Sequence, residues 1–145
     1  MKIEFHSGVP DKLDHACRLL RKAQAAGARV VVAGDPAGLD RLDVALWTFD
    51  ALAFVPHVRL RGNAEPGPVA QRTTVWLTDA PSRSAWRDVL VNLGPEMVDG
   101  WQEFARVIEV VQEGDAERGP ARQRWRTYGG HPGVELVHHA LGAAP

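Results

Sequence analysis

Three side chains near the end of the chain, Arg122, Trp125 and Arg126, have types and a spacing suited to binding. Positions i, i+3 and i+4 of a helix share one face, so we expect these side chains to form one patch. Two guanidiniums beside an indole can bind carboxylates and offer an apolar wall to a hydrophobic side chain. The pattern therefore favours an acidic peptide that ends in a hydrophobic residue as the ligand.

The charge of this region leaves two alternatives open. Between Arg118 and Val134 the chain has four arginines and no acidic residue, although the whole protein has a net charge of −1. Arginines next to an aromatic ring also suit single-stranded nucleic acid, whose phosphates and bases need the same groups. The other alternative is a solvated basic face with Trp125 packed into the core. The balanced overall charge gives no global attraction to nucleic acid or to a membrane.

A second candidate surface is the segment WTFDALAFVPHVRL, which begins where a helix is expected to end. Loops are usually polar, so this much apolar and aromatic area at an irregular junction needs a reason. Trp47 falls at the edge of the apolar helix face or outside it, and Pro56 restricts Val55 to an extended conformation. A rigid apolar segment of this kind suits docking of a partner protein. Alternatively, Phe54 and Val55 cover the end of the sheet.

The sequence contains no recognisable catalytic or cofactor-binding motif. The chain contains neither G-x-G-x-x-G nor G-x-x-x-x-G-K-[ST], and Asp35 followed by Pro36 predicts a helix cap rather than a phosphate site. None of the six histidines has the spacing of a helical metal site, and we expect the adjacent His138 and His139 to lie in a solvated tail. Cys17 lies on an apolar helix face and is predicted to be a core thiol. We therefore expect no enzyme activity, no metal and no cofactor.

The bulk properties indicate one soluble domain spanning residues 1–145. Its 145 residues, 45% hydrophobic and 24% charged, are enough to bury a core. One cysteine excludes an internal disulfide and fits a reducing cytoplasm. The sequence has neither a signal peptide nor an apolar run long enough for a membrane span, so we expect a cytoplasmic protein.

Strand and helix patterns alternate along the chain, which predicts a three-layer α/β/α sandwich. The sheet is expected to be mostly parallel, with about five strands. The strands are predicted at 1–6, 28–33, 74–77, 89–93 and 106–111. The helices are predicted at 11–26, 35–49 and 95–104, with a last one that starts near Pro120 because proline is costly inside a helix. The tail beyond His131 has no strong pattern.

Several of these blocks, in this order, resemble the chi subunit family of bacterial DNA polymerase III. The resemblance covers the chain from its first strand to about Tyr128. It is carried by DRLDVALWTFDALAFVPH at 40–57, RDVLVNLG at 87–94, FARVIEVV at 104–111 and RQRWRTY at 122–128.

This resemblance implies a non-catalytic adaptor in the clamp-loader assembly, on a Rossmann-like fold that lacks the nucleotide site. Chi proteins bind the psi subunit through an apolar surface and hold the acidic C-terminal tail of single-stranded DNA-binding protein. By resemblance, psi would be bound by Trp47, Phe54, Val55, Pro56 and His57, and the tail by Arg122, Trp125 and Arg126. Gly129 stands where relatives can carry another basic residue, so this pocket has one cation fewer.

Overall fold

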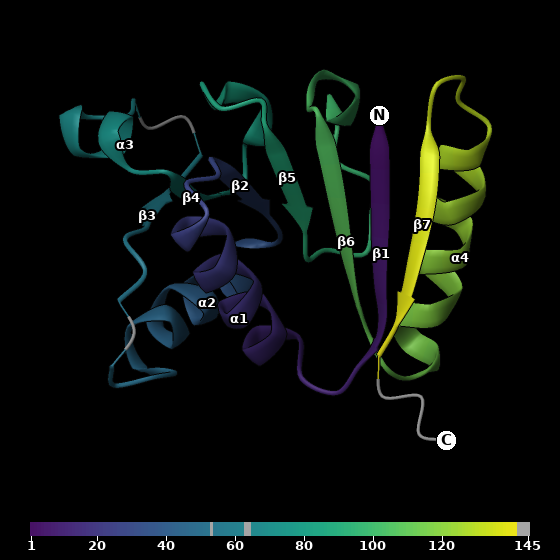
Figure 1. Ribbon diagram of the computed structural model, residues 1–145, viewed down its shortest axis with the longest axis horizontal. Coiled ribbons are helices and arrows are strands. Elements are labelled where there is room, and N and C mark those ends of the chain that lie inside the picture. The colour runs from purple at the N-terminus through teal and green to yellow at the C-terminus, as the bar shows by residue number, and fades with distance from the viewer. Residues whose placement is uncertain (53, 63–64, 142–145) are drawn as a thin grey trace.

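The computed structural model describes residues 1–52, 54–62 and 65–141, which form a single parallel sheet flanked by helices (Figure 1). Every strand pairing among these residues is parallel. The strand order is β3-β4-β2-β5-β6-β1-β7. The strands are β1 (Lys2–Val9), β2 (Val30–Ala33), β3 (Val58–Leu60), β4 (Val75–Thr78), β5 (Val89–Asn92), β6 (Arg106–Gln112) and β7 (Glu135–Ala140). The helices are α1 (Lys12–Ala25), α2 (Pro36–Thr48), α3 (Pro68–Arg72) and α4 (Asp115–Gly129), with 3-10 turns η1 (Pro81–Arg83) and η2 (Trp101–Glu103).

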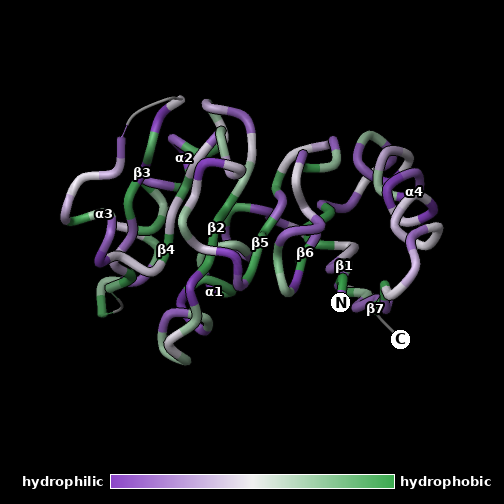
Figure 2. Tube along the Cα trace, turned by 90° about the horizontal axis from the view of Figure 1, so that it is seen from above, coloured by the Kyte–Doolittle hydropathy of each residue, from purple (hydrophilic) through white to green (hydrophobic). Residues whose placement is uncertain are grey.

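The central strand β2 shows how the sequence produces three layers. Val30 and Val32 pack into one core cluster with α1 and α2, whereas Val31 and Ala33 pack into a second cluster with α4. Successive residues of a strand point to opposite faces, so an uninterrupted apolar run is required where both faces are covered. The predicted α/β sandwich is confirmed. Figure 2 shows hydrophilic residues along much of α4, which lies on the outer side of the sheet.

The start of α2 and the burial of Cys17 agree with the sequence. The Asp35 side chain accepts a hydrogen bond from the backbone N–H of Gly38 at 3.3 Å, as a helix cap does. Cys17 is buried in α1, and burial raises its thiol pKa to about 11. None of the helices in the described part of the chain combines the length and apolar character that a bilayer crossing requires.

The sheet has seven strands rather than about five because both edge strands escaped the sequence patterns. β3 is only three residues long, and β7 contains glutamate and two histidines among its six residues. The part of the chain after His131 therefore contains an edge strand, Glu135–Ala140, where the sequence showed no strong pattern. β7 runs parallel to β1, pairing Lys2 through Ser7 with Glu135 through Ala140.

Two helix predictions are wrong. α4 begins at Asp115, before Pro120, because other contacts hold its first turn. Glu117 accepts a hydrogen bond from the Gln112 backbone N–H at 3.0 Å and pairs with Lys12 at 2.7 Å. These contacts offset the one helical hydrogen bond that a proline removes.

The other error concerns residues 95–104, where the structure has only the short turn η2. Side chains take the carbonyls that a helix would have used, since Asn92 donates to the Glu96 carbonyl at 2.7 Å and Arg124 donates to the Pro95 carbonyl at 2.5 Å. Gly100 then has a φ of 82°, which interrupts helical geometry.

Candidate functional site

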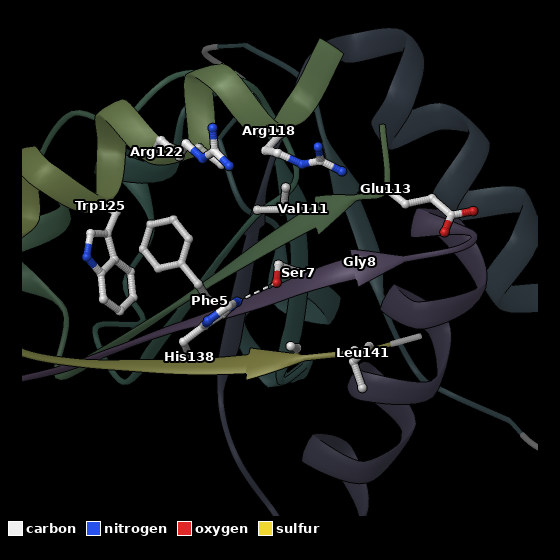
Figure 3. A pocket seen from close by; sticks show the side chains of 12 residues that line it. Phe5, Ser7, Gly8, Val111, Glu113, Arg118, Arg122, Trp125, His138 and Leu141 are labelled. Carbon is white, nitrogen blue, oxygen red and sulfur yellow. Dashed lines mark hydrogen bonds between the residues drawn. The ribbon is translucent and has the colours of Figure 1, made fainter. Parts of the chain in front are cut away.

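A cavity of about 560 Å³ opens between α4 and the strands β1 and β7 (Figure 3), and we call it the α4 pocket. Its floor contains Phe5 of β1 and Val111, while Trp125 of α4 forms one wall. The rings of Phe5 and Trp125 meet edge to face with centroids 5.2 Å apart. The pocket therefore combines a fixed aromatic wall with enough volume for one large hydrophobic side chain.

Two arginines from successive turns of α4, Arg118 and Arg122, line this pocket (Figure 3). Arg118 pairs with the exposed Asp115 at 3.1 Å. Arg122 has no hydrogen bond or ion pair with any residue in the described ranges, so its donors are available to a ligand. Arg126 is exposed one turn further along but does not line the pocket. The three residues expected to form one patch are thus divided, since Arg122 and Trp125 line the pocket and Arg126 does not. Arg118, which the spacing argument did not select, lines the pocket with them.

The remaining arginine of α4, Arg124, is buried and has a structural role. Its Nε donates to Glu109 of β6 at 3.0 Å, and the Tyr128 hydroxyl donates to the same carboxylate at 2.6 Å. Burial raises the pKa of Tyr128, and the nearby Glu109 charge raises it further, so the hydroxyl keeps its proton. Asn92 adds a third donor to Glu109 at 3.1 Å. This buried network fixes the rotation of α4 about its axis and so aims Arg122 and Trp125 at the pocket.

Gly8 forms part of the pocket where β1 meets the end of β7. Its φ is 67°, and a Cβ atom there would lie 2.2 Å from the Leu141 carbonyl oxygen. A side chain at position 8 would push the end of β7 away, so the close approach of the two strands requires glycine.

The segment that connects α2 to β3 lies at the other edge of the sheet (Figure 1). We define the aromatic junction as three exposed side chains there, Trp47 near the end of α2 and Leu52 and Phe54 of the connecting segment. Trp47 is 57% exposed, Phe54 63% and Leu52 98%, so they do not belong to the core. The rings of Trp47 and Phe54 lie 5.5 Å apart. Large contiguous apolar groups at the surface are typical of protein interaction sites.

The FVPH block is divided between this surface and the interior. Val55 is 1% exposed and packs into the core cluster beneath α2. The buried His57 ring lies 2.7 Å from the Val55 carbonyl oxygen and 2.8 Å from Asp43 Oδ1, and stacks at a tilt 5.0 Å from Trp47. Of the residues selected from the sequence, Trp47 and Phe54 are exposed at the junction, while Val55 and His57 support them from below. The half-buried Pro56 connects the two groups.

The charged groups around the junction are paired. Arg59 and Arg61 both contact Asp40, at 3.1 and 2.8 Å, and Arg21 contacts Asp50 at 2.9 Å. The hydrogen bond from Arg61 holds the pKa of Asp40 below its usual range. The exposed aromatic groups therefore lie among neutralised charges, unlike the pocket with its available Arg122.

Histidines expected in a solvated tail lie instead on β7. His138 faces the α4 pocket, with its Nε2 2.5 Å from Ser7 Oγ, and His139 faces the opposite side of the sheet. Neighbouring residues of a strand point to opposite faces of the sheet. Recognition of this strand in the sequence would therefore have placed His138 and His139 on opposite faces.

The strand order and the helices on both faces define an α/β/α sandwich with a Rossmann-like parallel sheet. Residues 1–136 match the family model described as DNA polymerase III chi subunit, HolC, and the chain belongs to this family. It is 37% identical to DNA polymerase III subunit chi of Pseudomonas aeruginosa over 131 residues, covering 90% of this chain and 87% of that protein. The subunit chi of Escherichia coli is 31% identical over 121 residues, covering 77% and 74% of the two chains. That of Haemophilus influenzae is 31% identical over 112 residues, covering 77% and 75%.

Proposed function

We propose that this chi-family protein is a non-catalytic adaptor that joins the psi subunit of DNA polymerase III to the acidic C-terminal tail of single-stranded DNA-binding protein. The observation that carries the proposal is the α4 pocket, where an apolar floor lies beneath Arg118 and Arg122, and Arg122 has no partner among the described residues. The family membership supports a role within DNA polymerase III. The aromatic junction at the opposite edge supplies a separate surface for a second protein.

In the α4 pocket, Arg122 and Arg118 would bind carboxylates of the tail, with Arg126 adding attraction from outside the pocket. The last hydrophobic side chain of the tail would enter the cavity between Phe5 and Trp125. Glu113 also lines the cavity and would repel a carboxylate placed beside it, which directs the acidic part of the peptide toward the arginines. Because few groups are buried, we expect a dissociation constant on the order of micromolar.

At the aromatic junction, psi would cover Trp47, Leu52 and Phe54. Each large side chain removed from water contributes about 1.5–3 kcal/mol to binding. Val55, Pro56 and His57 would act by holding the exposed rings in place, because Val55 and the His57 side chain are buried in the free protein.

The pocket assignment is tested by titrating the protein with a labelled peptide that copies the acidic, hydrophobic-ended tail. A second peptide lacks the last hydrophobic residue. We expect saturable binding of the first peptide and at least tenfold weaker binding of the second, because the cavity is then left empty. Equal binding of both peptides would contradict the pocket assignment.

Single-stranded nucleic acid is the competing ligand for α4, because arginines and an indole also suit phosphates and bases. The same titration with an oligonucleotide separates the two functions. Oligonucleotide binding that Arg122→Ala and Trp125→Ala abolish, with no peptide binding, would replace the adaptor proposal.

A further inference from the structure

We infer that Glu4, His6 and His139 form a binding site for a divalent transition-metal ion, of which Zn²⁺ is the best matched. The site lies on the face of β1 and β7 opposite to the α4 pocket. It is independent of the proposed function.

The strand geometry brings the three side chains together. Glu4 and His6 are two residues apart on β1 and therefore share one face, and His139 of β7 is the register partner of His6. One ligand atom from each of the three residues lies within 4.8 Å of the other two. His139 Nε2 is 3.8 Å from Glu4 Oε1. Tetrahedral zinc with bonds of about 2.0 Å places its ligands about 3.3 Å apart, so a small side-chain rotation closes the set.

A fourth residue, His15 of α1, orients the His6 ring from outside the ligand set. Its Nε2 lies 2.9 Å from Nδ1 of His6, and the two rings meet at 85°. This contact occupies Nδ1 and leaves Nε2 of His6 for a metal ion. Metal-binding imidazoles characteristically have such a partner on their second nitrogen, which fixes the ring.

The burial of the three ligands leaves one side of the site open to solvent. Glu4 is buried, His6 is half-buried and His139 is exposed, which leaves access for the ion and for a water molecule as fourth ligand. Two imidazoles, one carboxylate and water form a donor set typical of zinc.

Two cationic side chains compete with a metal ion for the Glu4 carboxylate and should lower the affinity for the ion. Lys2 contacts Glu4 Oε1 at 3.2 Å, and Arg106 of β6 contacts Oε2 at 2.5 Å. A metal ion would displace Lys2 from Oε1, while Arg106 keeps Oε2. The alternative is that this cluster only fastens the edge strand β7 to β1. If the cluster has only this structural role, removal of the Lys2 side chain would not increase the affinity for metal. If it is a metal site, the affinity for the ion would increase, because Lys2 no longer competes for Glu4.

The test is calorimetric titration of the full-length, untagged and chelator-treated protein with ZnCl₂, repeated for His139→Gln and His138→Gln. The two variants change neighbouring residues of one exposed strand whose side chains point to opposite faces, so they are closely matched. We expect one ion per chain, at least tenfold weaker binding for His139→Gln, and unchanged binding for His138→Gln. His15→Ala should weaken binding about tenfold, and Lys2→Ala should strengthen it.

Co²⁺ provides a second measurement, since its visible absorption reports a tetrahedral site directly. Circular dichroism of each variant verifies that the fold is kept. The inference is overturned by the absence of saturable Zn²⁺ binding, by undiminished binding in His139→Gln, or by equal losses in His138→Gln and His139→Gln.

Discussion

The aromatic junction and the α4 pocket lie at opposite edges of the same sheet and differ in shape, charge and support. The junction presents Trp47 and Phe54 outward, among arginines that aspartates already neutralise. The α4 pocket is recessed and has an arginine without a partner in the described part of the chain, above an aromatic floor. A projecting apolar surface suits a lasting contact with a folded partner, and a recessed basic pocket suits a short charged peptide.

The largest expected effect concerns the support of the pocket. Arg124→Ala leaves Glu109 buried without its cationic partner and should lower the free energy of unfolding by about 3–5 kcal/mol. Arg122→Ala, two residues earlier on the same helix, removes only an exposed side chain and should change stability by no more than about 0.5 kcal/mol. Urea unfolding measures both. Equal stability of the two variants would show that the buried network does not hold α4.

The next effect concerns the junction. Phe54→Ala should weaken psi binding by about 1.5–3 kcal/mol, because an exposed ring that the partner covers is lost. Its tail-peptide affinity should remain within about twofold of wild type. Co-elution with psi and peptide titration provide the two readouts. Val69→Ala is the matched control, since Val69 is 69% exposed on α3 and outside the junction. Intact psi binding by Phe54→Ala would refute the assignment.

Within the pocket, Trp125→Ala and Arg122→Ala should each weaken the tail peptide about tenfold, the first by removing a wall and the second a charge-assisted hydrogen bond. Arg126→Ala should cost less, about threefold, because its side chain lies outside the cavity in solvent. Fluorescence anisotropy with the labelled peptide measures the series. An Arg126→Ala loss larger than that of Arg122→Ala would place the ligand outside the pocket.

The smallest expected effect is that of salt, which should weaken binding at the α4 pocket more than binding at the aromatic junction. Raising NaCl from 50 to 300 mM screens the arginine–carboxylate contacts and should weaken the peptide several-fold. Psi binding should change less than twofold because apolar burial is not screened. A steep loss of psi binding with salt would indicate that charged groups, not Trp47 and Phe54, dominate that interface.

The sequence predicted the centre of the fold better than its edges. Three consecutive valines identified β2 because a strand covered on both faces must be apolar throughout. β7 was missed because an exposed edge strand tolerates Glu135, His138 and His139, which remove the alternating pattern. Pro120 misled the prediction of α4, since propensity reports the cost of proline but not the Glu117 contacts that offset it.

The candidate sites were predictable in type but not in detail. Helical spacing placed Arg122 and Trp125 on one face, and both line the pocket. Spacing did not distinguish the buried Arg124 from its exposed neighbours, because that depends on Glu109 in a distant strand. The family resemblance assigned Val55 and His57 to the same surface as Phe54, although the chain turns both side chains into the interior.

In the proposed function, one chain joins two partners at independent surfaces. The most direct test titrates the labelled tail peptide against the protein alone and against the protein saturated with psi. We expect dissociation constants that agree within twofold and a complex containing one copy each of protein, psi and peptide. Displacement of the peptide by psi would contradict it.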